Sequence, residues 1–502
     1  QSGFLMPQLI DSSSLGLSFK LPYYKVLGDN KDFTFTPRIF SETEVLFQNE
    51  YRQVNKNSNH IVDFSLKEKD STSKTHFFSN STSKLNIDNF DTSEIELNLE
   101  TTSDENYLKT HNIKSSINND QSLLESFLIF RANSRDMNLE TKIEAYEDLT
   151  KDKASDRYEY IFPSFEFSKI FPSNYNGNYE IISRGNYKNY NTNIFEKVLI
   201  NDIKFSSNQK ITSLGLKNKF SLLFKNVTSE GDNSSDYKNK FNSENYGSFF
   251  YDMAYPMKKG GEFFDSFFTA KGSLMYSPNA NKDLKTLDRK IDLNNIFSQN
   301  RLSLNDTVEG GQSLTVGGEY NLQDKESGKD IIKAGLATVF RDNEEINLPK
   351  KSTLNNRGSD LIGSLIFEPN KNLKFDYNFS MDNDFESTNY NLFKTDISVN
   401  KFVTSFEFLQ EDDEVGSESY LSNETSYNFN NSNSLKYRTR RNKKTDFTEF
   451  YNLIYEYKND CLTASIQYNK DYYSDKELKP TEEIFFSISI VPLATLNTPS
   501  VR

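Results

Sequence analysis

The feature that most constrains this chain is a strict two-residue alternation of apolar and polar residues. It is clearest in four segments, residues 15–21, 373–381, 462–469 and 486–490. Alternation of this period puts one set of side chains on each face of a β-strand. The segments between these runs are rich in Asn, Ser, Asp, Gly and Lys, which favour turns. No block of ten or more residues shows a clean helical stripe, so we expect a single all-β unit.

Composition decides which kind of β-structure the alternation builds. Only 35% of the 502 residues are apolar, which is too few for an ordinary compact core. Yet 14% are Phe or Tyr, and disordered chains are poor in aromatic residues. We find no fixed-period repeat of the kind that solenoids and propellers show. A wall with one face in lipid and one in a wet lumen fits this balance.

We therefore predict a large antiparallel transmembrane β-barrel with long loops. About 26 strands of about 10 residues would use about 260 residues and leave about 240 for the connections. Fewer, longer strands fit equally well, so composition alone does not fix the strand count. The alternation runs from about Leu15 to about Val491 without a linker. We expect residues 1–14 to lead into the barrel, residues 15–491 to form it, and residues 492–502 to be a C-terminal tail.

Several classes of protein are excluded at this point. No window of about 18 consecutive apolar residues exists, so we expect no transmembrane helix. A single Cys excludes a disulfide scaffold and a multi-Cys zinc site. A net charge of −13 argues against nucleic-acid binding. The chain opens without a signal peptide, although one could have been removed earlier.

Signals for catalysis are weak. His60, His76 and His111 are the only histidines, and they lack metal-ligand spacing. There is no nucleophile elbow, phosphate-binding loop or dinucleotide fingerprint. The acidic run at residues 411–414 could bind a divalent cation, but we favour a solvated loop. We expect no enzyme activity, no catalytic residue, no metal and no cofactor.

A basic stretch near residue 440 is more informative. On a strand, Lys436, Arg438 and Arg440 would share one face. If that face lines the lumen, these side chains could contact the phosphates of an anionic glycolipid, because guanidinium groups pair well with phosphate. The alternative, which we favour on composition, is a solvated strand end paired with nearby acids.

Two prolines interrupt the first alternating segments. Pro22 lies within residues 15–26, and Pro37 lies within residues 33–40. Proline donates no backbone hydrogen bond, so strand prolines belong at edges or bulges, and a closed barrel has no edge. Either they weaken pairing where the first strand meets the last, or each begins or ends a strand beside a turn. Composition favours the second reading.

Five segments together resemble one known family. They are residues 2–7 (SGFLMP), residues 21–24 with 32–38 (LPYY and DFTFTPR), residues 50–52 (EYR), residues 300–302 with Asp306 and 308–311 (NRL and VEGG), and residues 457–461 (YKNDC). This set is similar to the outer-membrane lipopolysaccharide-assembly family LptD, also called the organic-solvent-tolerance family. The chain resembles its barrel portion.

The resemblance implies a function and a set of site residues. It implies a barrel of about 26 strands in the bacterial outer membrane, which inserts lipopolysaccharide into the outer leaflet through a polar lumen and a lateral gate between the first and last strands. It carries the gate prolines over to Pro22 and Pro37. The last clear alternation, residues 483–491, would face the seam, and Phe19 and Ile488 are a trial pair across it.

The same resemblance implies partners. A lipoprotein plug of the LptE kind would sit in the lumen, and a periplasmic bridge protein would join through an N-terminal domain that this sequence lacks. Cys461 corresponds to the family's disulfide cysteine. Many members have adjacent cysteines there, whereas Leu462 follows here, so whether Cys461 is bonded stays open.

Two rival functions stay open. One is a porin or nutrient-uptake barrel without a lateral gate, which a uniformly paired seam would favour. The other is a barrel-assembly protein or adhesin, which would need periplasmic repeats or a passenger domain.

Overall fold

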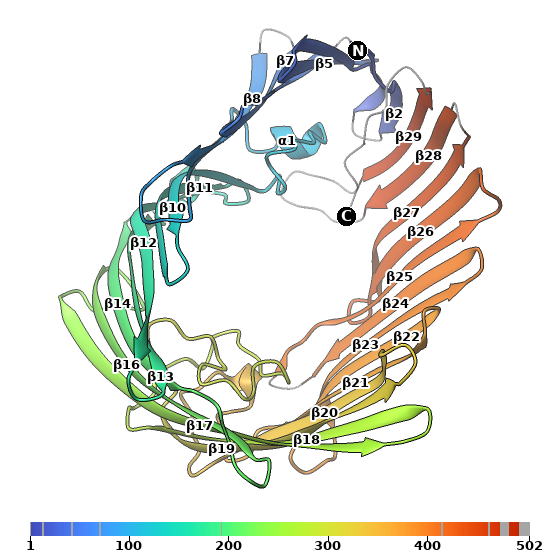
Figure 1. The fold of residues 1–502 in the computed structure, drawn as a ribbon. Helices are drawn as coiled ribbons and strands as arrows, with labels where there is room; N and C mark the ends of the chain where they lie inside the picture. The colour runs from blue at the N-terminus through green and yellow to red at the C-terminus, as the bar shows by residue number, and fades with distance from the viewer. Residues whose placement is uncertain are drawn as a thin grey trace.

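The computed structural model describes residues 2–12, 15–41, 44–69, 72–191, 193–412, 415–459, 462–471 and 481–490. These residues form an almost purely antiparallel β-structure. Viewed along its axis, the sheet curves into a ring in which the last strands return to the first (Figure 1).

The strands follow one another around the ring in chain order. The first group is β1 (Gly3–Phe4), β2 (Gln8–Ser12), β3 (Gly16–Lys20), β4 (Tyr23–Gly28), β5 (Lys31–Phe40), β6 (Val45–Val54), β7 (Ser58–Lys69), β8 (Thr72–Leu85) and β9 (Thr92–Thr102). The second group is β10 (Leu123–Asn133), β11 (Met137–Asp148), β12 (Tyr158–Ser173), β13 (Gly177–Tyr190), β14 (Ile194–Ser207), β15 (Lys210–Ile211), β16 (Lys217–Asp232), β17 (Asn242–Gly260) and β18 (Phe264–Ser277).

The third group closes the ring. It is β19 (Gly311–Asp324), β20 (Asp330–Arg341), β21 (Leu361–Asn370), β22 (Leu373–Met381), β23 (Thr388–Val399), β24 (Phe402–Glu411), β25 (Ser419–Asn428), β26 (Asn433–Asn442), β27 (Phe447–Lys458), β28 (Leu462–Asp471) and β29 (Thr481–Ile490). The helices assigned in the described residues are α1 (Tyr107–Thr110), η1 (Ala154–Asp156) and η2 (Lys350–Ser352).

In the part of the chain that the structure describes, the 29 strand segments combine into a closed barrel of 26 strands. β1 and β2 form the first barrel strand, because they pair with β4 and β3. β3 and β4 form the second, because both pair with β5. β14 and β15 likewise share the partner β16. The predicted fold class and strand number are confirmed. Residues 1–14, expected as a lead-in, contain β1 and β2, so the wall begins before residue 15.

The alternation sorts side chains between the two faces of the wall. In β3, Leu17 and Phe19 are 47% and 42% exposed on the outer face, whereas Ser18 between them is 1% exposed on the inner face. Many other large apolar side chains are exposed in the same way along the strands, and many buried residues are polar or charged. This is the reverse of a water-soluble core and suits an outer face in lipid.

No helix in the described ranges is both long and apolar enough to cross a membrane.

Three long connections lie at the same end of the barrel, opposite Gly3: residues 103–122, 278–310 and 342–360. They fold back into the ring, where α1 and the segments near β13 and β20 lie inside the wall (Figure 1). The alternation of apolar and polar residues does not predict that these connections fill part of the lumen. The contacts that create this filling join residues far apart in the chain, and the α1 helix is only four residues long.

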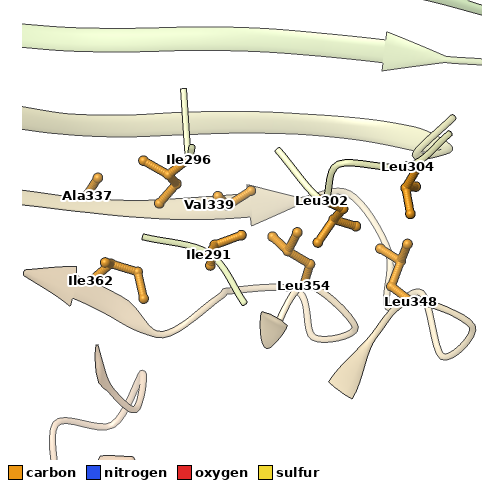
Figure 2. Close-up of a cluster of buried hydrophobic side chains, with 9 residues drawn as sticks. All are labelled: Ile291, Ile296, Leu302, Leu304, Ala337, Val339, Leu348, Leu354 and Ile362. Carbon is orange, nitrogen blue, oxygen red and sulfur yellow. The ribbon is translucent and has the colours of Figure 1, made fainter. Parts of the chain in front are cut away.

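An apolar cluster fixes two of these connections to the wall. Ile291, Ile296, Leu302 and Leu304 of residues 278–310 meet Leu348 and Leu354 of residues 342–360, and both pack on the inward side chains of β20 and β21 (Figure 2). The wall contributes Ala337, Val339 and Ile362. Complete burial of one Leu or Ile side chain contributes about 1.5–3 kcal/mol. Several such side chains hold the two connections in place.

A buried ion cluster sits beside this apolar cluster. Arg301 donates to Glu309 (Nε to Oε2, 2.9 Å), to Thr315 (3.2 Å) and to Ser313 (3.0 Å). Arg341 pairs with the same carboxylate from β20. Burial would raise the pKa of Glu309, but the two guanidinium groups outweigh burial and hold that pKa below its usual value. The carboxylate therefore stays ionised and ties residues 278–310 to the wall.

Candidate functional site

The seam between the first and last barrel strands is paired over only part of its length. Gln8–Ser12 of β2 pairs with residues 483–487 of β29, five residue pairs in all. On its other side β29 pairs with β28 over ten residue pairs. Among the described residues, no pairing joins β1 to β29. The seam is thus closed at the end with the long connections and unpaired toward Gly3.

Three prolines lie close together where this pairing stops. Pro7 separates β1 from β2, Pro22 separates β3 from β4, and Pro37 lies within β5. Each is within two residues of the row Gln8–Lys20–Arg38 that the strand register defines. Pro22 and Pro37 are thus brought together, beside a third proline.

The prolines leave two backbone pairs half made. Leu5 N–H donates to Pro22 O (2.8 Å), and Leu21 N–H donates to Pro37 O (3.1 Å). A hydrogen-bonded antiparallel pair normally exchanges two such bonds, but proline has no N–H to return. Backbone pairing between the first and second barrel strands, and between the second and third, is therefore weaker beside these prolines.

Sequence analysis missed Pro7. Its signal was available, because Pro7 precedes Pro22 by the same fifteen residues that separate Pro22 from Pro37. The segment around Pro7 lacks alternation, so its sequence predicts a lead-in and not a strand.

The trial pair Phe19 and Ile488 does not lie directly across the seam. Phe19 belongs to the second barrel strand and faces Leu9 and Ile39, while Ile488 faces Ala464 of β28. The residues that face each other across the seam include Leu9 with Phe486 and Ile10 with Phe485. The register differs because the first strand is β1–β2 and not the segment that begins at residue 15.

The connection at residues 103–122 lies against the inner face of these first strands. Arg38 donates to Ser18 Oγ (3.0 Å) and to the carbonyl oxygen of His111 (2.7 Å). Gln48 donates to the carbonyl oxygen of Lys114 (2.9 Å). Tyr107 and Leu108 of α1 join Phe40, Leu46 and Phe78 of the wall in one apolar cluster. Wall residues of β5, β6 and β8 therefore anchor this connection.

A buried polar network under α1 has the composition of a catalytic triad. Ser65 Oγ lies 2.5 Å from His76 Nδ1, and His76 Nε2 lies 3.2 Å from Asp63 Oδ1. All three residues are at most 2% exposed. The Ser65 hydroxyl is also held by Tyr107 OH at 2.7 Å. A hydroxyl so enclosed cannot reach a substrate, so we interpret the network as the polar base on which α1 docks.

The other two histidines have ordinary surroundings. His60 lies between the hydroxyls of Ser58 and Ser81, each at 3.0 Å. His111 is 3% exposed, and its Nδ1 lies 3.0 Å from the carbonyl oxygen of Tyr107. Burial lowers the pKa of His111 to about 4. In the described ranges, no group of three or more His, Cys, Asp or Glu could hold a metal ion.

The basic strand β26 faces acids. Arg438 pairs with Glu424 (3.2 Å), and Arg440 pairs with Glu449 (2.9 Å) and stacks on the Tyr420 ring (4.0 Å). Lys436, Arg438 and Arg440 share one face of the wall. The exposed side chains of Leu453 and Tyr455, which pair with Tyr437 and Leu435, mark the other face. Contact of these cations with lipid phosphates stays a prediction. Cys461, Asp413 and Glu414 lie outside the described residues.

Comparison with models of known protein families shows to which family the chain belongs. The model of the family LptD, described as LPS transport system D, matches residues 74–403, which is more than half of the chain. The chain belongs to the LptD family. Its barrel is accordingly an integral protein of the outer membrane.

One curated LptD relative matches a smaller region. The LPS-assembly protein LptD of Pseudoalteromonas atlantica is 31% identical over 111 residues, which are 22% of this chain and 14% of the relative. The matched region thus spans about one seventh of that relative's length.

Solved outer-membrane receptors match with low similarity. The alcaligin receptor FauA of Bordetella pertussis has a TM-score of 0.33 and 6% identity, over 98% of this chain and 76% of its own. The siderophore receptor PiuA of Acinetobacter baumannii has a TM-score of 0.34 and 7% identity, over 98% and 82%. The iron transporter FrpB of Neisseria meningitidis (F3-3 variant) has a TM-score of 0.34 and 7% identity, over 98% and 81%.

Proposed function

We propose that this LptD barrel inserts lipopolysaccharide into the outer leaflet through a lateral gate at the β2–β29 seam. The saccharide would pass through the polar lumen, and the acyl chains would leave sideways between the first and last strands. The observation that carries the proposal is the half-paired seam beside Pro7, Pro22 and Pro37. Family membership supports the substrate class.

The number of hydrogen bonds in each ladder favours the β2–β29 seam as the place where the ring opens. Five residue pairs of an antiparallel ladder carry about five hydrogen bonds. At about 0.5–1.5 kcal/mol each, the seam ladder costs a few kcal/mol to break. The neighbouring β28–β29 ladder is twice as long. The two half-made proline pairs let the first strand bend away from β29 with little further loss.

The connections suggest which way the barrel faces. Outer-membrane barrels have short periplasmic turns and longer extracellular loops. The connections at residues 103–122, 278–310 and 342–360 would then lie outside, and Gly3 would lie on the periplasmic side. The unpaired half of the seam would admit acyl chains from the periplasmic side, and the five remaining pairs would be the barrier to the outer leaflet.

Partners follow from the family and belong to the same proposal. A lipoprotein plug of the LptE kind would occupy the lumen, and a periplasmic bridge protein would deliver the glycolipid through a domain N-terminal to this barrel. Cys461 would bond to a Cys of that domain. Residues 278–310 lie on the far side of the ring from the seam (Figure 1), so they leave the gate clear.

A cross-link across the seam tests the gate. With Leu9→Cys and Phe486→Cys in the full-length protein, we expect oxidation to block delivery of lipopolysaccharide to the cell surface and reduction to restore it. A matched control joins the same residue to the other neighbour, as Ile466→Cys with Phe486→Cys, because Ile466 faces Phe486 within the β28–β29 ladder. The control should deliver normally. Normal delivery through the oxidised seam would refute the gate and favour a porin or nutrient-uptake barrel.

A further inference from the structure

Two cations face each other on the inner wall beside the seam. Lys20 of β3 is directly opposite Arg38 of β5. Their neighbours Phe19 and Ile39 are exposed on the outer face, so Lys20 and Arg38 belong to the inner face. Like charges directly opposite each other destabilise a sheet. Arg38 offsets part of this cost by anchoring residues 103–122, whereas Lys20 makes no hydrogen bond or ion pair in the described residues.

The two cations lie in the row where the seam ladder ends. Lys20 is opposite Gln8 of β2, and Gln8 is opposite Ser487 of β29. Gln8 and Ser487 are the last pair of the seam before the unpaired half. An amide from one side of the seam and a hydroxyl from the other thus lie in the same row as two positive charges, and the Ser487 hydroxyl also bonds to the Ser465 hydroxyl (2.7 Å).

In the part of the chain that the structure describes, neither cation makes a direct contact with a carboxylate. Arg38 is 6% exposed, and its guanidinium group donates to the Ser18 hydroxyl and to the His111 carbonyl oxygen. Among the residues that the structure describes, the ammonium group of Lys20 has no hydrogen bond or ion pair. A third cation, Lys114, lies close enough to repel Lys20. Lys114 is exposed and comes from the connection that Arg38 anchors.

Acids also lie near this cluster, Asp63 and Glu483 among them. The carboxylate of Asp63 accepts two bonds from Gln48, each at 3.1 Å, and contacts His76. Glu483 of β29 acts on Arg38 electrostatically across the seam. The carboxylate of Asp63 is thus already engaged by Gln48 and His76. In β26, by contrast, Arg438 and Arg440 each have their own carboxylate.

We propose that Lys20, Arg38 and Lys114, together with Gln8 and Ser487, form a binding site for a phosphate monoester on the luminal side of the seam. Ammonium and guanidinium groups bind phosphate oxygens strongly, and an amide and a hydroxyl can complete the set. Since Gln8 and Ser487 belong to the two sides of the seam, a phosphate bound there bridges the gate. The source of that phosphate, a phosphorylated saccharide of the glycolipid, rests on the proposed function.

Binding measurements on the full-length protein with its natural partners test the site. Three probes are compared: lipopolysaccharide, the same glycolipid after enzymatic dephosphorylation, and inorganic phosphate as a competitor. We expect the phosphorylated glycolipid to bind at least about ten-fold more tightly than the dephosphorylated one. Lys20→Gln should abolish most of this difference, since a charge-assisted hydrogen bond is worth about a factor of ten or more in affinity.

Two further variants keep the test sharp. Lys204→Gln is the matched control, because Lys204 of β14 is a half-buried lysine next to the outward-facing Ile203 and has no ion pair within the described ranges. It should bind as the wild type does. Lys20→Glu converts the repulsive pair with Arg38 into an attractive one. The barrel should stay at least as resistant to heat while its preference for phosphate is lost.

The possible outcomes distinguish glycolipid phosphate from free phosphate as the ligand, and they distinguish the phosphate site from the lateral gate. Competition by inorganic phosphate that Lys20→Gln abolishes supports the site and makes free phosphate a second ligand. Preference for the phosphorylated glycolipid without competition supports the site with the headgroup as its source. Equal binding of both glycolipids, or a Lys20→Glu barrel that binds as the wild type does, overturns it. Binding is measured without export, so a failed seam cross-link would leave this result standing.

Discussion

His111 is neutral because of where it sits. Its Nδ1 faces the carbonyl oxygen of Tyr107, while its Nε2 is buried without a hydrogen-bond partner in the described part of the chain. A proton added at Nε2 would find no acceptor, and Arg38 and Lys67 would repel it. Glu44 opposes them only in part, so burial dominates and holds the pKa of His111 at about 4.

Acidification should loosen the connection at residues 103–122. A histidine with a lowered pKa in the folded state contributes stability that is complete above about pH 6.5 and is lost as the pH falls toward about 4. We expect backbone amides of residues 103–122 to exchange faster at about pH 5 than at about pH 7, after correction for intrinsic exchange. His111→Phe, which keeps a ring against Phe40 but cannot be protonated, should remove this dependence. Equal protection at both pH values in the wild type would contradict it.

The docking of residues 278–310 onto the wall depends on the buried carboxylate of Glu309. It is 4% exposed between Arg301 and Arg341, and removing one partner of a buried ionic cluster leaves charges uncompensated. We expect Glu309→Ala to cost about 3–5 kcal/mol in the docking of residues 278–310. Proteolysis of the folded barrel should then cut within this segment. Asp288→Asn is the control, because its pair with Lys351 is largely exposed and worth at most about 1 kcal/mol. Resistance of Glu309→Ala to protease would show that the apolar cluster alone suffices.

At the scale of strands, the sequence predicts the strands of the wall well, but it predicts the seam between the first and last strands poorly. Alternation identifies segments such as β22 and β28 because each strand has one face in lipid and one in the lumen. β1 and β2 escape it, since they are two and five residues long and separated around Pro7. The lumen filling escapes it too, because the cluster around Ile296 and Leu354 depends on contacts between two distant connections.

The prolines should act on the gate and not simply on stability. Replacing Pro22 and Pro37 by Ala restores the N–H groups that Leu5 O and Leu21 O lack. Each restored bond should stabilise the barrel by about 0.5–1.5 kcal/mol. We expect higher resistance to thermal unfolding together with slower delivery of lipopolysaccharide to the cell surface. Pro256→Ala is the control, because Pro256 lies in β17 opposite Thr269, far around the ring from the seam. Unchanged delivery in the double variant would remove the prolines from the gate mechanism.

At the scale of the whole molecule, the ring stays closed only while the seam between the first and last strands stays paired. While β2 and β29 stay paired, the edges of the first and last strands are free only along the unpaired half of the seam in the described residues, and both edges become fully free once the two strands part. The apolar clusters and the Arg301–Glu309–Arg341 cluster tie the connections to the middle of the wall and to the first strands, but those clusters do not span the seam. In the described residues, the barrel as a whole is therefore held shut by a ladder of five residue pairs, fewer than join any other two neighbouring barrel strands.

Unfolding of the barrel should accordingly begin at the seam. Unboiled outer-membrane barrels migrate as compact species in mild-detergent gels, and the rate at which this species is lost on heating reports the opening of the ring. We expect the oxidised Leu9→Cys, Phe486→Cys variant to lose it at least about ten-fold more slowly than the reduced one, because stabilising a contact that is absent from the transition state slows unfolding. The oxidised Ile466→Cys, Phe486→Cys variant should convert at close to the wild-type rate, since it links strands that part later. Equal slowing by both cross-links would mean that the ring opens elsewhere, and the weak joint would then have to be sought among the other ladders.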